Sequence, residues 1–212
     1  MSFQDKLLDS FIAFEQVIDL DNPIHTDRKN ALKRFESKGF PTKKDELWKY
    51  TSLKSITQKD YSLSVKNNPN VGLKDIKKYS INDIDSYKIV FVDGVFNPFL
   101  SKTTHDGMDV CVLSAALSKS KYKKTINKYF NNIVPDDQSL ASLNTSYTQE
   151  GAYIHIPKSV LPEDPVQILH FSSGKNKPLW LQPRNIIIVE ENARVEIIER
   201  HQSLRTVSYT HL

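Results

Sequence analysis

The chain has 212 residues, 39% hydrophobic and 25% charged, a composition that suits one or two globular domains and argues against a disordered polymer. No apolar run approaches the roughly 20 residues that span a bilayer, and Asp5, Asp9 and Glu15 interrupt the apolar N-terminus, unlike a signal peptide. The net charge is only +4, and six of the 29 basic residues are arginine, which disfavours nucleic-acid binding. We therefore expect a cytoplasmic protein that binds neither nucleic acid nor membrane.

Two helices are expected at the N-terminus. Apolar residues recur at helical spacing from Phe3 to Ile18, and Asp21-Asn22-Pro23 then breaks the pattern. A second helix is expected to begin with a cap at Thr26 or Asp27 and to end at Gly39. A left-handed conformation at Gly39 would bring Phe35 against Phe40.

The segment FPTKKDELWKYTSL follows this second helix. Thr42, with Asp45 three residues later, is expected to cap another short helix. Leu47, Trp48 and Tyr50 would then pack against the first two helices, with Trp48 largely buried. A helix-turn-helix is the alternative, but the basic residues around Trp48 are lysines, and the aromatic mass favours packing.

The middle of the chain mixes strands and helices. YKIVFVDGVFNPFLS predicts a β-hairpin that turns at Asp93-Gly94. DVCVLSAAL predicts a further strand, in which Cys111 is interpreted as a small structural residue and not as a reactive thiol. Helical patterns follow at residues 126–133 and 140–147. The lysines of segment 119–128 are expected on a solvated helix face, with a phosphate-binding strip as the alternative.

After Gly151 only strand patterns remain: AYIHIP, PVQILHF, NIIIVEE and ARVEIIERHQ. This spacing fits a jelly roll, a sandwich or a parallel β-helix, and the periodicity alone does not choose among them. His155, His170 and His201 lie on these strands, and two of them could align if the strands stack. Isolated strand histidines are more often structural, so the sequence assigns no catalytic, metal or cofactor residue.

Several segments occur in an order and spacing that resemble a known family. They run from about Phe40 to Ser203 and include ELWKYTSL, FVDGVFNPFLS, LASLNTSYTQEGAYIHIPKSV, PVQILHF and RNIIIVEENARVEIIERHQS. Together they are similar to the N-terminal half of SufD, a subunit family of the SUF iron–sulfur cluster assembly machinery. The related SufB family usually carries cysteines in its early region, whereas this chain has only Cys111, so SufD is the better match.

The resemblance implies an α+β chain and a non-catalytic role. A helical and mixed α/β region over residues 1–150 would precede the first coils of a parallel β-helix over residues 151–206. SufD-like chains pair with a SufB-like subunit and bind a SufC-like ATPase through C-terminal helices, and the full complex assembles the iron–sulfur cluster. The interface histidine and the ATPase-binding helices of the family fall beyond residue 212. No glycine-rich phosphate loop occurs in this sequence, so ATP hydrolysis is expected in the partner and no cofactor in this chain.

The last residues do not resemble the family. Residues 207–212 read VSYTHL, the translation of a common transposase sequencing adapter. We expect this tail to be non-native and the chain to be truncated at its C-terminus, with a natural terminus as the alternative.

A second function remains open at this level. The strands after Gly151 could form a stand-alone cupin-like or jelly-roll module that binds a small ligand or a metal. Such sites need several histidines and a glutamate converging inside one barrel. The three strand histidines are too sparsely placed in the sequence to show that they converge in this way.

Overall fold

The computed structural model describes residues 2–16, 18, 24–63, 71–79, 81, 85–103, 107–135, 137–173 and 178–204. The α-helices are α1 (Phe3–Glu15), α2 (His25–Lys38), α3 (Lys54–Thr57), α4 (Leu73–Ile76), α5 (Leu113–Ser118), α6 (Ser120–Tyr129) and α7 (Ser139–Tyr147). The strands are β1 (Tyr87–Val92), β2 (Val95–Phe96), β3 (Asp109–Val112), β4 (Ala152–Ile156), β5 (Val166–Ser172), β6 (Ile186–Val189) and β7 (Ile197–Ser203). The expected α+β class is confirmed. None of the helices in these ranges is long and apolar enough to cross a membrane.

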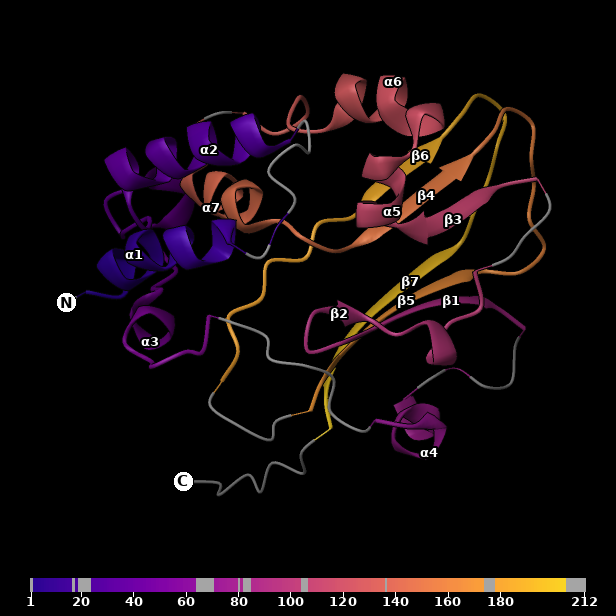
Figure 1. The fold of residues 1–212 in the computed structure, drawn as a ribbon, viewed down its shortest axis with the longest axis horizontal. Coiled ribbons are helices and arrows are strands. Elements are labelled where there is room, and N and C mark those ends of the chain that lie inside the picture. Colours follow the sequence, from indigo (N-terminus) through magenta and orange to yellow (C-terminus); the bar gives the residue numbers. More distant parts are fainter. Residues whose placement is uncertain are drawn as a thin grey trace.

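The strands form two sheets, with the orders β2-β1-β5-β7 and β3-β4-β6 (Figure 1). The pairs β1–β5, β5–β7 and β4–β6 are parallel, whereas the pairs β1–β2 and β3–β4 are antiparallel. Both sheets therefore combine strands from before and after residue 150.

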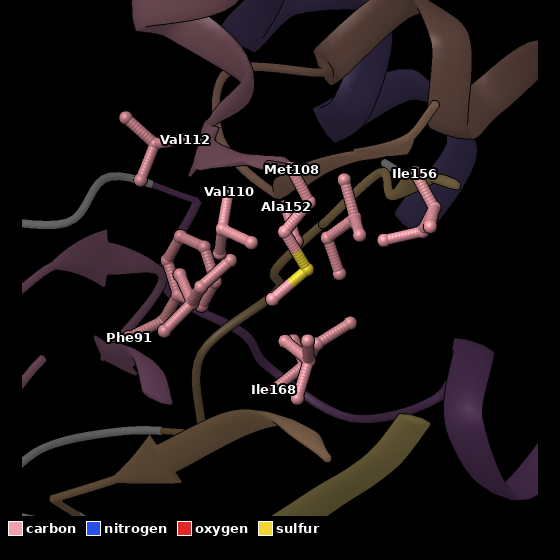
Figure 2. Packing of buried hydrophobic residues seen from close by; sticks show 10 residues of the cluster. Phe91, Met108, Val110, Val112, Ala152, Ile156 and Ile168 are labelled. Carbon is pink, nitrogen blue, oxygen red and sulfur yellow. The ribbon is translucent and has the colours of Figure 1, made fainter. Parts of the chain in front are cut away.

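A hydrophobic core fills the space between the two sheets. It contains Phe91 and Ile168 from one sheet and Val110, Ala152 and Ile156 from the other. Figure 2 shows the side chain of Met108 pointing from the β3 side toward Ile168. Alternating residues of each strand face this core, as the period of two along a strand requires.

Helices cover the outer face of each sheet. Helices α5 and α6 pack on the β3-β4-β6 sheet through a cluster that joins Leu113 and Ile126 to Tyr153. On the other side, Ile76 of α4 packs against Val90 and Leu169. The result is a helix–sheet–sheet–helix arrangement, with α1, α2 and α7 grouped at one end (Figure 1).

Consecutive strands of the C-terminal part alternate between the two sheets. The chain passes from β4 to β5 in the opposite sheet, then back to β6 and across again to β7. Strand β6 lies in register on β4, and β7 lies in register on β5. All four strands lie within the segments that the sequence pattern predicted, and Asn192 has a φ of 57° in the turn between β6 and β7.

The N-terminal helices agree with the sequence pattern. Phe3, Leu7 and Phe11 form the buried face of α1. Helix α2 begins at His25, slightly before the predicted caps, and the predicted break at Asp21-Asn22-Pro23 lies outside the described residues. Gly39 ends α2 with a φ of 67°.

The predicted contact at the end of α2 is confirmed. The Gly39 N–H donates to the Phe35 carbonyl over 2.6 Å. The Phe35 and Phe40 rings meet edge to face with their centroids 5.1 Å apart.

The predicted packing of the ELWKY segment is wrong. Leu47 and Tyr50 are 77% and 91% exposed, and Trp48 is half-buried outside every buried cluster of the described residues. A short 3-10 helix spans Glu46–Trp48, and its N-cap is Asp45 rather than the expected Thr42, whose N–H donates to the Asp45 carboxylate. A helix this short presents too little surface to hold all three large side chains against α1.

Another tryptophan packs against α1 instead. Trp180 contacts Phe3, Phe40 and Tyr61, with ring centroids 5.0, 6.3 and 5.3 Å away. This aromatic cluster joins the start of α1 to the segment between β5 and β6. Nothing in the local sequence distinguishes Trp180 from Trp48 as a packing residue, because the contact depends on the path of the chain after β5.

In the middle of the chain the hairpin and the helical pattern at residues 140–147 are confirmed, whereas the pattern at residues 126–133 is only partly correct, because α6 ends at Tyr129 and Ile133 is 75% exposed beyond it. Strands β1 and β2 pair across Asp93 and Gly94, whose φ angles are 50° and 81°, as a two-residue hairpin turn requires. The strand predicted over DVCVLSAAL ends earlier than expected, at Val112. Leu113 then begins α5, which buries Leu113 and Ala116 against the sheet.

Candidate functional site

Three aromatic rings form a ladder across one sheet. Phe91 on β1 pairs in register with His170 on β5, which pairs with His201 on β7. The Phe91 and His170 rings stack with centroids 4.8 Å apart and planes 10° apart, and the His170 and His201 rings stack at 4.5 Å and 9°. The predicted strands thus bring two of the three strand histidines together.

Strand β7 also carries an acid on the same face. Glu199 pairs in register with Ile168, a residue of the core between the sheets. Its Oε1 atom lies 3.0 Å from Nε2 of His201 and 3.7 Å from Nε2 of His170. On β7, the last strand of this sheet in the described structure, core-facing positions therefore carry ionisable side chains, whereas the neighbouring strand has the apolar Ile168 opposite Glu199.

The carboxylate of Glu199 is held from the opposite sheet. The Asn185 Nδ2 group donates to Oε1 of Glu199 over 3.1 Å, and Oδ1 of Asn185 accepts from the Ala152 N–H over 2.8 Å. Asn185 thereby fixes the acid relative to the backbone of β4. Sequence reasoning found neither Asn185 nor Glu199, because their position facing His170 depends on strand pairing.

His170 is the buried member of the cluster. Its side chain is 10% exposed, compared with 41% for Glu199 and 61% for His201. Burial and the positive charge of His201 lower the pKa of His170 to about 4, and Glu199 opposes only part of this shift. The ring is therefore neutral at pH 7. Its Nε2 atom is buried and has no hydrogen-bond partner within the described structure.

The ladder opens on a pocket of about 1160 Å³. Phe91, His170 and His201 line one side of this pocket, and Tyr147 of α7 and Trp180 line another. The pocket lies where the helical end of the molecule meets the β2-β1-β5-β7 sheet. A small ligand or ion that enters it reaches the imidazoles directly.

His155 lies elsewhere and has a different environment. Its Nε2 atom is 2.9 Å from Glu190, and its Nδ1 atom is 3.7 Å from Asp109. The hydrogen bond from His155 and another from the Lys158 N–H lower the pKa of Glu190. His155 therefore links β3, β4 and the turn after β6, which is a structural role.

The two remaining candidates behave as ordinary structural features. Cys111 is half-buried on β3, paired with Tyr153, and burial raises the pKa of its thiol. The lysines of segment 119–128 lie on the exposed face of α6, while Tyr122 and Ile126 form its buried face. The strand position of Cys111 and the exposed lysine face of α6 agree with the sequence pattern.

The class of protein follows from a match to a known family. Residues 1–168 match the family model of the SufBD protein N-terminal region. The match covers well over half of the chain, so the chain belongs to the SufBD family.

Individual relatives agree with this assignment. An iron–sulfur cluster assembly SufBD family protein of Synechocystis sp. is 24% identical over 186 residues, which are 88% of this chain and 41% of the relative. The iron–sulfur cluster assembly protein SufD of Escherichia coli is 25% identical over 170 residues, or 78% of this chain and 36% of SufD. A second SufBD family protein of Synechocystis is 30% identical over 117 residues, which are 52% of this chain and 24% of the relative. The chain spans less than half the length of these relatives.

Proposed function

We propose that this chain is the N-terminal part of a SufD-like scaffold subunit of an iron–sulfur cluster assembly complex. The family match over residues 1–168 carries the proposal. The single cysteine, Cys111, supports a SufD-like rather than a SufB-like subunit. The cytoplasm is the compartment that this role requires.

The strand arrangement supports a β-helical scaffold. We interpret β4 and β5 as one coil of a parallel β-helix and β6 and β7 as the next, because each strand stacks in parallel on the strand two places earlier. A β-helix grows by adding coils of this kind, and each coil contacts only its neighbours. The exposed edges of β6 and β7 are then the surfaces on which further coils are added.

The proposed role is structural and not enzymatic. ATP would be hydrolysed by a SufC-like partner, because this sequence offers no glycine-rich phosphate loop. A SufB-like subunit would pair with the β-helix, and the cluster would be assembled by the complex as a whole. The ATPase-binding helices of the family belong to its C-terminal half, outside the region that this chain matches.

Co-purification tests this proposal. The chain and a full-length homologue from the same source are each co-expressed with tagged SufB-like and SufC-like proteins. The full-length homologue should retain both partners, whereas the 212-residue chain should fail to retain the ATPase. Retention of the ATPase by the 212-residue chain alone would show that the ATPase interface lies in the N-terminal half.

The alternative of a stand-alone cupin-like or jelly-roll module is not favoured. Strands β4 and β6 pair in parallel, as do β5 and β7, whereas cupins and jelly rolls are built from antiparallel strands. The family match also covers both the helical region and the first strands after Gly151, which an independent binding module would not explain.

A further inference from the structure

We propose that His170, Glu199 and His201 form a binding site for a divalent first-row transition metal ion. The three side chains offer two imidazole nitrogens and one carboxylate oxygen, which all lie within 4.8 Å of one another. Two histidines and one carboxylate form a donor set that suits Zn²⁺ and Fe²⁺. The site goes beyond the scaffold role and does not depend on it.

The geometry brings the three ligand atoms close together, and a rotation of His201 is needed to hold an ion. At metal–ligand distances of about 2.0–2.2 Å, ligand atoms in a tetrahedral site lie about 3.3–3.6 Å apart. The Glu199–His201 pair at 3.0 Å and the Glu199–His170 pair at 3.7 Å lie close to this range, whereas the two imidazoles are stacked with their planes 9° apart and must turn for both ring nitrogens to face one ion. His201 is 61% exposed, so its side chain can rotate out of the stack toward the fixed ring of His170 and the Glu199 carboxylate that Asn185 holds. The fourth position faces the pocket and can take water or an exchangeable ligand.

A second observation supports the site. The buried Nε2 atom of His170 has no hydrogen-bond partner in the described structure. Buried polar atoms in native structures usually have a hydrogen-bond partner, because leaving one unsatisfied destabilises the fold. A metal ion at the cluster supplies that partner.

The surroundings match those of a metal ligand. Ligating carboxylates are commonly oriented by further hydrogen bonds, and Asn185 provides one to Glu199 while anchored on the Ala152 N–H. A purely structural ladder explains the stacking of Phe91 on His170, but it gives no reason for an acid at a core-facing position of β7. Glu199 takes a place where the neighbouring strand has Ile168.

His155 provides a matched comparison within the same fold. It is also a strand histidine with a carboxylate within 3 Å, and its side chain is 17% exposed. Its two ring nitrogens, however, face two different acids. The described residues contain one group of three ligand atoms that converge, and His155 is not in it.

Cobalt titration of the 212-residue chain tests the site directly. Co²⁺ should bind in a one-to-one ratio and give the visible d–d absorption of a low-coordinate site with nitrogen ligands. Zn²⁺ should displace it, as the order of divalent affinities requires. His201→Asn and Glu199→Gln should each weaken Co²⁺ binding by about 100-fold or more, and Asn185→Ala by about 10-fold, because outer-shell partners typically contribute 10–100-fold.

His155→Asn is the control, and it should leave Co²⁺ affinity and the spectrum unchanged. Circular dichroism verifies that each variant folds, and His201, as the more exposed histidine, is the substitution least able to disturb the core. A wild-type spectrum that stays octahedral, or equal loss of binding in the His155 and His201 variants, would overturn the proposal. Failure of co-purification with SUF partners would leave it intact, since this titration uses the chain alone.

Discussion

Gly151 lies directly against the backbone of Arg184. A Cβ atom at Gly151 would meet the Arg184 carbonyl oxygen at 1.8 Å and the carbonyl carbon at 2.4 Å. The Arg184 N–H also donates to the carbonyl of the preceding residue, Glu150, over 3.0 Å. The segment leading into β6 thus crosses the start of β4 at a point where only glycine fits.

Gly151→Ala should therefore destabilise the fold strongly. Neither main-chain segment can yield without breaking this crossing, so we expect a loss of at least about 3 kcal/mol in the free energy of unfolding. Gly72→Ala is the control, because a Cβ there meets nothing closer than 3.9 Å, and it should change stability by about 1 kcal/mol or less. Urea denaturation followed by circular dichroism measures both. Equal stability of the two variants would show that the crossing is not tight in solution.

The two tryptophans should differ in their contribution to stability. Trp180 packs among Phe3, Phe40 and Tyr61, so Trp180→Ala should cost about 3 kcal/mol. Trp48 lies outside the buried clusters, so Trp48→Ala should cost about 1 kcal/mol or less. Thermal and urea unfolding of the two variants compares them directly. A larger loss of stability in Trp48→Ala than in Trp180→Ala would contradict this assignment and support the buried Trp48 that the sequence alone suggested.

Glu150 should make stability depend on pH. Burial raises the pKa of its carboxyl group, and hydrogen bonds that include one donated by the Ser114 hydroxyl oppose part of this shift. Because the folded state holds the proton more tightly than the unfolded state, stability is greatest below the unfolded value of 4.5 and falls as the pH rises through the folded value.

Glu150→Gln should therefore raise the free energy of unfolding at pH 7 by about 1 kcal/mol, because it removes a partly buried charge whose Oε2 atom has no hydrogen-bond partner in the described structure. The gain should disappear below pH 4.5, where the wild-type carboxyl is protonated. Glu163→Gln, at an exposed glutamate, should give no such pH-dependent gain. Urea titrations at several pH values provide the test, and a gain that is equal at all pH values would contradict the assignment to charge.

The outer edges of β6 and β7 should promote self-association. These strands stand at the ends of the two sheet orders within the described residues, and Ile187 and Val189 of β6 are 42% and 45% exposed. Unpaired edges next to exposed apolar side chains favour edge-to-edge association.

A charge at this edge should oppose that association. Ile187→Lys should shift the chain toward monomer in size-exclusion chromatography with light scattering, whereas Val95→Lys should not. Val95 is the matched control, since it is 40% exposed on β2 at the opposite end of a sheet. A monomeric wild-type chain at high concentration would show that the β6 and β7 edges are protected.

The sequence predicts local features correctly where a few neighbouring residues determine the backbone conformation. Asp93-Gly94 predicts its hairpin because the turn needs positive φ angles that few residues adopt. Gly39 ends α2 for a related reason, and the alternating strands after Gly151 were located by composition. The order of the family segments, read along the chain, was enough to indicate the SufBD family that the comparisons then showed.

Strand partners and the candidate site were decided only by the tertiary structure. A period of two along a strand fixes which residues share a face, but it does not determine which strand lies beside it. The pairing of β5 with both β1 and β7 places His170 between Phe91 and His201. The same pairing turns Glu199 toward the core, and the path after β5 selects Trp180 over Trp48 as the aromatic anchor of α1. Such contacts join residues distant in sequence, so their physical cause is the packing of whole elements rather than any local pattern.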